Sequence, residues 1–206
     1  IMPRWTTYER IVLYAPTYRD HPDPERPFSA GDFRQLNEQL KSRNWCLLVK
    51  KHHFDTTMAL PEAMSNIIDI SQEVEDIQEV LVQTDILISD YSSTFIYYLL
   101  RRKPAVFYIY DREKYLDESR PMYCEYLEEV PGPFARNAQE LFDLLFGVDD
   151  WFEKDTYQAK FEASVDFYHT FQDGDSCNSG RSCHGGGHPG SRFLGRHQPC
   201  SWKPAS

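Results

Sequence analysis

Short apolar runs alternate with amphipathic stretches along most of this chain. Several runs are apolar at successive positions, which is typical of strands buried on both faces of a sheet. These runs are Ile11–Ala15, Trp45–Val49, Ile67–Ile70, Ile86–Ile88 and Pro104–Ile109. Because a helical stretch follows almost every run, the pattern predicts an α/β fold: a Rossmann-like, doubly wound parallel sheet with helices on both faces.

The helical stretches carry apolar residues three or four positions apart, the spacing that places them on one helix face. The stripes are Phe33, Leu36 and Leu40; Val74, Ile77, Val80 and Leu81; Phe95, Tyr98 and Leu99; the run Ala138–Leu145; and, beyond Trp151, Tyr157, Phe161, Val165 and Tyr168. We therefore expect residues 1–176 to form one domain that ends in a long helix.

The composition changes sharply after Ser176. Residues 177–206 hold six of the ten glycines, almost no aliphatic residues and no helical or alternating period. Such a segment does not bury enough apolar surface to fold, so the sequence predicts a disordered or artefactual tail. Its scattered cysteines and histidines lack the paired spacing of a zinc site.

Charge and composition exclude several classes of protein. A formal net charge of −10 argues against a general nucleic-acid binder, which needs a basic face. No segment approaches the roughly 18–20 continuous apolar residues of a membrane span, so we expect a soluble or at most peripheral protein. Five cysteines at irregular spacing indicate a reducing, cytoplasmic setting. The G-x-G-x-x-G, Walker A and H-E-x-x-H motifs are absent, which excludes the common dinucleotide-binding, P-loop and zincin interpretations.

Polar segments follow four of the predicted strands. They are Pro16–Asp20, Lys50–His53, Ser89–Thr94 and the segment that starts at Asp111. In an open α/β sheet, ligands bind beyond the carboxyl ends of the strands. We therefore expect the functional site where these segments meet.

The segment Ser89–Thr94 (S-D-Y-S-S-T) stands between a buried strand and a helix predicted to start near Ser92 or Ser93. Backbone N–H groups at a helix start lack partners within the helix, and the helix dipole is positive there. The place therefore suits an anion, phosphate above all. The alternative is that Asp90 or Ser92 only caps the helix.

Several short motifs occur in an order that resembles one known family. They are A-P-T-Y-R-D at Ala15–Asp20, K-x-H at Lys50–His52, I-L-I-S-D-Y-S-S at Ile86–Ser93, D-x-E-K-Y at Asp111–Tyr115, P-G-P at Pro131–Pro133 and F-x-D-G at Phe171–Gly174. Over roughly residues 10–176 the chain resembles the C-terminal, donor-binding half of the CDP-glycerol glycerophosphotransferase family. That family has the GT-B fold, so the resemblance implies the second of two Rossmann-like domains, with the N-terminal GT-B domain missing.

The resemblance implies a transferase of teichoic-acid or capsule synthesis. In this reaction a hydroxyl of a lipid-linked acceptor attacks the β-phosphate of CDP-glycerol, or CDP-ribitol, and CMP leaves. Such an enzyme would work in the cytoplasm, as a peripheral protein at the inner face of the bacterial membrane. Two alternatives remain open: a GT-B transferase that uses another nucleotide sugar, and a truncated, inactive module that only binds nucleotide.

The resemblance also suggests roles for the hydroxyl and carboxylate side chains at the strand ends. We expect Ser92, Ser93 and Thr94, with their backbone N–H groups, to hold the pyrophosphate of the donor. Because N–H groups and cations can neutralise the pyrophosphate in a GT-B donor domain, the resemblance implies no cofactor and no obligatory metal. Asp90 only accepts hydrogen bonds and would repel phosphate, so we assign it to a ribose or glycerol hydroxyl or to holding the turn.

The other candidates are histidine and basic side chains. We expect His52 to donate to the pyrophosphate or to protonate the leaving CMP; the alternative is a loop histidine tied to a backbone carbonyl. Arg19, Lys50 and Arg120 are expected to contact phosphate, although a lone loop cation is more often a surface charge. The chain departs from the family pattern at His53, where proline is usual.

Overall fold

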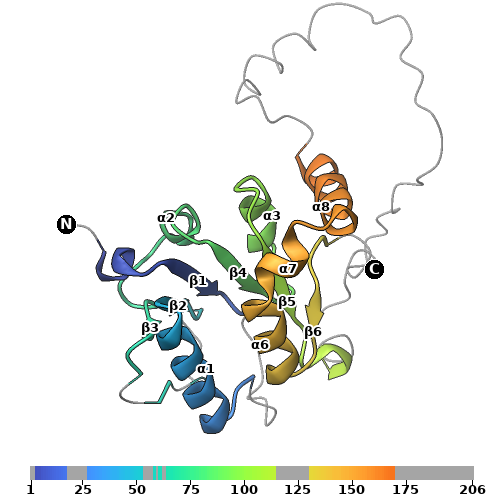
Figure 1. Cartoon of the computed structure of the whole chain (residues 1–206). Coiled ribbons are helices and arrows are strands. Elements are labelled where there is room, and N and C mark those ends of the chain that lie inside the picture. Colours follow the sequence, from blue (N-terminus) through green and yellow to red (C-terminus); the bar gives the residue numbers. More distant parts are fainter. Residues whose placement is uncertain are drawn as a thin grey trace, which may run out of the picture.

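A six-stranded parallel sheet organises the chain (Figure 1). The computed structural model describes residues 3–17, 27–52, 58, 60–61, 64–114 and 130–169, and the statements below concern these residues. The strands are β1 (Arg10–Tyr14), β2 (Trp45–Val49), β3 (Ile67–Asp69), β4 (Ile86–Ser89), β5 (Ala105–Tyr108) and β6 (Phe134–Ala135). They lie in the order β3-β2-β1-β4-β5-β6, and every neighbouring pair is parallel. This order is that of the Rossmann fold, which confirms the predicted fold class.

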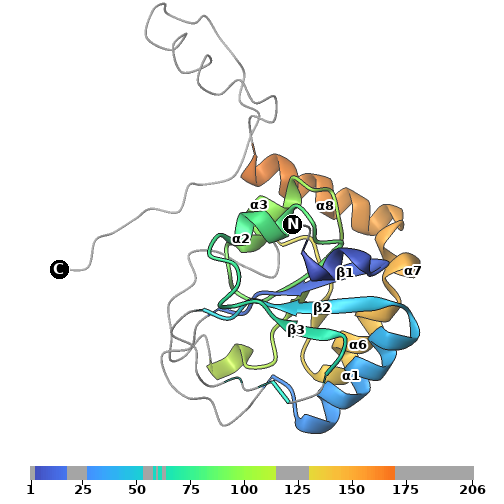
Figure 2. The same cartoon turned by 90° about the vertical axis from the view of Figure 1, so that its left-hand side faces the viewer.

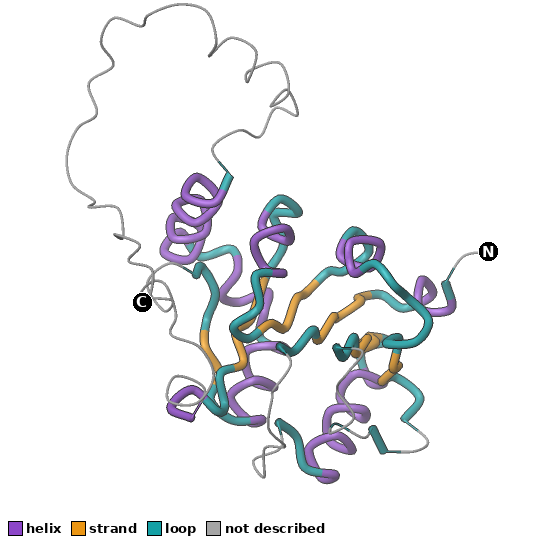
Figure 3. Tube along the Cα trace, turned by 180° about the vertical axis from the view of Figure 1, so that it is seen from behind, coloured by secondary structure: helices purple, strands orange, loops and turns teal. Residues whose placement is uncertain are grey.

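Helices cover both faces of the sheet (Figures 1 and 3). One face carries α2 (Ile77–Leu81), α3 (Thr94–Leu99) and α8 (Asp155–Tyr168), and the other carries α1 (Ala30–Ser42), α6 (Ala138–Phe146) and α7 (Val148–Phe152). A short 3₁₀ helix, η1 (Arg4–Thr7), precedes β1. Successive residues of β1 enter opposite cores: Leu13 packs with the first set of helices, and Val12 and Tyr14 pack with the second. The sheet is therefore buried on both faces, as the continuous apolar runs predict.

The longest described helix, α8, supports α3 from outside (Figure 2). The rings of Phe95 on α3 and Tyr168 on α8 meet edge to face with centroids 5.4 Å apart. A ring nitrogen of His169, directly after α8, lies 2.7 Å from the carbonyl oxygen of Ile96. These contacts fix the helix that follows the S-D-Y-S-S turn, although α3 itself is short.

The predicted elements are present, with shifts at their ends. The third strand stops at Asp69, and the helix predicted from Val74 starts only at Ile77. The reason is Asp76, whose carboxylate accepts a hydrogen bond from the Gln78 N–H at 2.8 Å and caps the helix there. No sequence pattern predicts β6, because two residues are too few to show a period. The predicted tail over residues 177–206 lies outside the described residues.

The direction of strand succession reverses between β1 and β4. From β1 the chain proceeds outward to β2 and β3, and from β4 it proceeds the other way to β5 and β6. At such a point the segments that follow the two central strands leave toward opposite faces, which opens a crevice at the carboxyl ends. Tyr14 of β1 is in register with Ile88 of β4, so the segments after these residues begin side by side.

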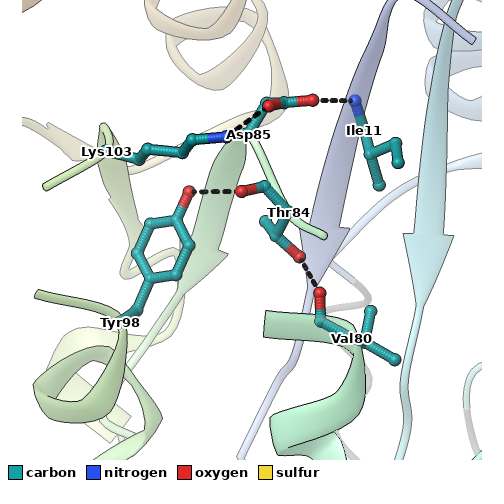
Figure 4. A network of polar contacts seen from close by, with 6 residues as sticks. All are labelled: Ile11, Val80, Thr84, Asp85, Tyr98 and Lys103. Atoms are coloured by element: carbon teal, nitrogen blue, oxygen red, sulfur yellow. Dashed lines mark hydrogen bonds and ion pairs between the residues drawn. The ribbon is translucent and has the colours of Figure 1, made fainter. Parts of the chain in front are cut away.

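A polar network joins the same two strands at the amino end of the sheet (Figure 4). Asp85 accepts a hydrogen bond from the Ile11 N–H at 2.9 Å and forms an ion pair with Lys103 at 2.6 Å. Beside it, the Tyr98 hydroxyl donates to the carbonyl oxygen of Thr84 at 3.3 Å. Burial, with the charge of Asp85 in addition, raises the pKa of Tyr98, so this hydroxyl remains a donor. The network anchors β1, β4 and the start of β5 far from the crevice.

Candidate functional site

The carboxylate of Asp90 spans the point where the strand order reverses. Asp90 follows β4 directly and is 1% exposed. One oxygen accepts hydrogen bonds from the Thr17 hydroxyl at 2.6 Å and the Thr17 N–H at 3.0 Å, and the other lies 2.9 Å from the same N–H. The Ser92 N–H also donates to Asp90, at 3.3 Å. Of the roles predicted for Asp90, holding the turn is the one that these contacts support.

The two serines at the start of α3 have different surroundings. Ser92 Oγ accepts a hydrogen bond from the Thr94 N–H at 3.2 Å and donates to Thr94 Oγ1 at 2.8 Å. Ser93 is the N-cap residue, but it is exposed and its side chain makes no capping hydrogen bond. The capping alternative therefore applies to Ser92, whereas the Ser93 hydroxyl has no part in starting the helix.

Two adjacent lysines follow β2, and only one of them is used by the fold. The ammonium group of Lys51 pairs with Asp69 at 2.7 Å and donates to the carbonyl oxygen of Met58 at 3.1 Å. The Lys50 N–H donates to the carbonyl oxygen of Tyr14 at 3.0 Å, which places Lys50 beside the end of β1. Within the described residues, the ammonium group of Lys50 forms no ion pair. Lys50 is therefore the lysine suited to an anionic ligand.

A compact polar set fixes the segment from which Lys50 and His52 emerge. The Lys51 N–H donates to Ser71 Oγ at 2.9 Å, and the Ser71 N–H donates to Asp69 at 2.9 Å. Burial alone would raise the pKa of Asp69, but the hydrogen bonds from Lys51 and Ser71 hold this pKa below its usual value. The charged carboxylate of Asp69 therefore fixes the position of the segment that follows β2. His52 is exposed just beyond it.

A buried carboxylate also lies at the end of β5. Asp111 is 4% exposed, and the Tyr91 hydroxyl donates to it at 3.4 Å. Because Tyr91 is the neighbour of Asp90, this contact ties the β4–α3 turn to a third strand end. The polar groups at the carboxyl edge of the sheet thus support one another across β1, β4 and β5.

The structure brings most of the described candidate residues to adjoining strand ends. Asp90 and Ser92–Thr94 follow β4, and Lys50 and His52 follow β2, with the end of β1 between them. Arg19, His53 and Arg120 lie outside the described residues, so their predicted roles stay predictions.

Sequence reasoning did not single out Thr17, Tyr91 or Lys51. Each lies one to three residues beyond a buried strand, and this position was the only signal available. Which of several polar neighbours turns toward the crevice depends on hydrogen bonds to distant segments, and a single sequence does not reveal these.

The described part of the chain contains neither a metal-ligating cluster nor a membrane-spanning helix. No group of three or more His, Cys, Asp or Glu side chains is placed to hold a metal ion there. None of its helices is long and apolar enough to cross a bilayer.

A doubly wound parallel sheet with polar groups gathered at its switch point defines a Rossmann-like domain. The family is shown by the sequence: the profile of the CDP-Glycerol:Poly(glycerophosphate) glycerophosphotransferase family matches residues 5–179. The chain belongs to this family, as the order of its motifs predicts.

Curated relatives work in teichoic-acid synthesis. The teichoic acid glycerol-phosphate transferase of Staphylococcus aureus is 31% identical over 167 residues, which cover 79% of this chain and 41% of the relative. The teichoic acid glycerol-phosphate primase of Bacillus spizizenii is 38% identical over 144 residues, covering 68% of this chain and 36% of the relative. The ribitol-phosphate polymerase TarL of Staphylococcus aureus is 31% identical over 82% of this chain and 29% of its own length. The chain thus spans less than half the length of these relatives.

Solved structures agree with this assignment. The H-to-N variant of the wall teichoic acid polymerase TagF superposes with a TM-score of 0.70 at 25% identity, over 88% of this chain and 44% of that one. The same variant with CDPG, after a 30 minute soak, gives a TM-score of 0.69 at 26% identity, over 88% and 43% of the two chains. A putative UDP-N-acetylglucosamine 2-epimerase from Listeria monocytogenes, at 15% identity and a TM-score of 0.55, shares the fold alone.

Proposed function

We propose that this chain is the donor-binding part of a glycerophosphotransferase that takes glycerol phosphate from CDP-glycerol for teichoic-acid synthesis. The observation that carries the proposal is the set of polar groups gathered at the β1–β4 switch point. The exposed Ser93 hydroxyl follows β4, the Lys50 ammonium group follows β2, and the end of β1 lies between them, beside a turn held by Asp90. Within the described residues this ammonium group forms no ion pair. The relatives that share this domain are named for glycerol-phosphate and ribitol-phosphate transfer, which supports the choice of donor.

The proposed chemistry needs donors and cations around a pyrophosphate. An acceptor hydroxyl oxygen forms a bond to the β-phosphorus, the bond from that phosphorus to the bridging oxygen breaks, and CMP leaves with the electron pair. The Ser93 hydroxyl donates to the phosphoryl oxygens, and Lys50 offsets their charge. His52 donates a proton to the leaving phosphate. Arg19 and Arg120 complete the cation set in this proposal.

The acceptor side is assigned to the rest of such an enzyme. Since the chain spans 41% of the glycerol-phosphate transferase it resembles, we assign the base that takes the acceptor proton to an N-terminal GT-B domain. In the proposal, that domain also recruits a lipid-linked polyol phosphate at the inner face of the membrane. CDP-ribitol remains the alternative donor, because ribitol-phosphate polymerases are among the relatives.

Calorimetric titration of CDP-glycerol and of CMP tests the donor site. We expect saturable binding, weakened about 10-fold by Ser93→Ala, the loss of one hydrogen bond to a charged group. Ser92→Ala is less informative because Ser92 also caps α3. Ser42→Ala, at the far end of α1, is the matched control and should bind as the unchanged chain does. Among the described residues, the Ser42 hydroxyl contacts only the carbonyl oxygen of Gln39 and the Arg43 guanidinium. Equal affinity of the Ser93→Ala and Ser42→Ala variants would contradict the assigned site.

A further inference from the structure

The hydrogen bonds between Asp90 and Thr17 lie outside the part of the sheet in which backbone hydrogen bonds join β1 and β4. The last backbone bond between β1 and β4 runs from the Ala15 N–H to the carbonyl oxygen of Ile88, at 3.2 Å. Asp90 and Thr17 meet past this bond, just beyond the carboxyl ends of the two strands. At the other end of the sheet, Asp85 already anchors β4 to β1. A second carboxylate is therefore not required to align these strands.

A buried carboxylate is a costly group to place in the floor of an anion site. Taking a charged oxygen out of water is unfavourable unless hydrogen bonds replace the water, and a negative charge repels phosphate. Here the Thr17 hydroxyl, the Thr17 N–H and the Ser92 N–H all donate to Asp90. Because its oxygens point to these protein donors, Asp90 stabilises the two segments and not the donor molecule.

We propose that Asp90 is a positioning residue of the donor site, acting through Thr17. Its carboxylate holds the segment after β1 against the β4–α3 turn, so that the two segments form one preformed surface for the diphosphate. The turn carries Ser93, which the proposed function assigns to the phosphates. A donor that has to align these two segments itself binds more weakly. This inference rests on the proposed function and adds that Asp90 has no direct contact with the donor.

The pair of residues permits a double-mutant cycle with CDP-glycerol as the probe. Thr17→Val keeps the shape and the N–H but removes the hydroxyl, and Asp90→Asn turns an amide group toward the same donors. We expect each to raise the Kd about 10- to 100-fold, the range for losing a charge-assisted hydrogen bond. The Kd of the double variant should not exceed the higher of the two single-variant Kd values, because the two residues act as one unit. Thr17→Ser, which retains the hydroxyl, should restore wild-type affinity.

Asp85→Asn is the matched control for a general loss of stability. Asp85 also accepts a hydrogen bond from a β1 N–H, but at the opposite end of the sheet. We expect this variant to lower the melting temperature and to leave the Kd of the folded chain unchanged. Melting curves of all variants show whether each is folded at the titration temperature, and Thr17→Val keeps the test available if Asp90→Asn does not fold.

The outcomes separate the positioning role from the donor site itself. If the effects of Asp90→Asn and Thr17→Val multiply in the double variant, Asp90 contacts the donor directly and the inference is wrong. Unchanged affinity in both folded single variants also overturns it, while a Ser93→Ala defect would leave the proposed function standing. Absence of binding by the folded wild-type chain overturns the donor site and the inference together.

Discussion

Residues of the same type have different roles at the carboxyl edge of this sheet. Of two adjacent lysines, Lys51 is held by Asp69 and Lys50 is not, and of two adjacent serines, Ser92 caps α3 and Ser93 does not. The sequence predicts that this edge is polar, because the apolar runs end there. It does not predict which residue of each pair the fold uses, since that depends on partners from other segments, such as Met58 for Lys51.

The depressed pKa of Asp69 gives a pH-dependent contribution to stability. Burial works against its charged form, but the bonds from Lys51 and Ser71 prevail and lower the pKa. A group with a lowered pKa stabilises the fold above its unfolded value of about 3.9, and this contribution is lost as the pH falls through the folded value. Because the side chain of Asp69 is 36% exposed, solvent screening limits the effect at pH 7 to about 0.5–1 kcal/mol.

Urea denaturation of wild type and Asp69→Asn at pH 7, 5, 4 and 3 measures this contribution. We expect the difference in the free energy of unfolding to be constant from pH 7 to 5 and to shrink below about pH 4. Glu38→Gln, which removes an exposed carboxylate from α1, controls for the change in net charge. A difference that persists undiminished at pH 3 would show that charge on Asp69 is not its source.

At the scale of elements, the close packing of β5 against the segment before β6 limits what residue 132 tolerates. A Cβ atom added to Gly132 would lie 2.5 Å from the carbonyl oxygen of Ala105 and 2.5 Å from the ring of Phe107. β5 is hydrogen-bonded to a strand on each side, so its backbone cannot move away from the added atom without weakening those bonds. We therefore expect Gly132→Ala to lower the free energy of unfolding by about 1–3 kcal/mol.

Gly31→Ala is the matched control for Gly132→Ala. In the first turn of α1, the added Cβ atom meets only Ser29 Oγ, at 3.5 Å, and alanine favours the helix by up to about 1 kcal/mol. Chemical denaturation of both variants should therefore give changes of opposite sign. A stable Gly132→Ala protein would mean that the P-G-P segment moves away from β5 easily.

The success of sequence reasoning differed among the elements for a physical reason. Strands and helices with a long apolar pattern, such as β2 and α1, were predicted because one pattern specifies both the element and its buried face. The short elements were predicted less well. β6 has no apolar period, and α2 starts later than its apolar stripe because Asp76 caps it. The position of the site followed from the strand ends, whereas the bridge between Asp90 and Thr17 required the strand order, which no local pattern contains.

At the scale of the whole molecule, an acidic protein is proposed to bind an acidic ligand. The formal net charge is −10, so long-range attraction does not bring a nucleotide to the crevice. Affinity must come from local groups, namely the Ser93 hydroxyl and the ammonium group of Lys50. Because the Asp90 carboxylate is already hydrogen-bonded by Thr17 and Ser92, its charge is partly offset where the phosphates would lie.

Thermal unfolding in the presence of different nucleotides tests the donor at this scale. A ligand that binds only the folded chain stabilises it by about 2.7 kcal/mol at 100 times its Kd, which raises the melting temperature by roughly 5–10 °C for a domain of this size. We expect CDP-glycerol to give this shift, CMP a smaller one, and UDP-N-acetylglucosamine none. An equal shift with the UDP-sugar would favour a nucleotide-sugar transferase over the proposed function. Measuring CMP release in the same samples then separates an active chain from one that only binds: we expect binding without release, because the acceptor side is assigned to a domain outside this chain.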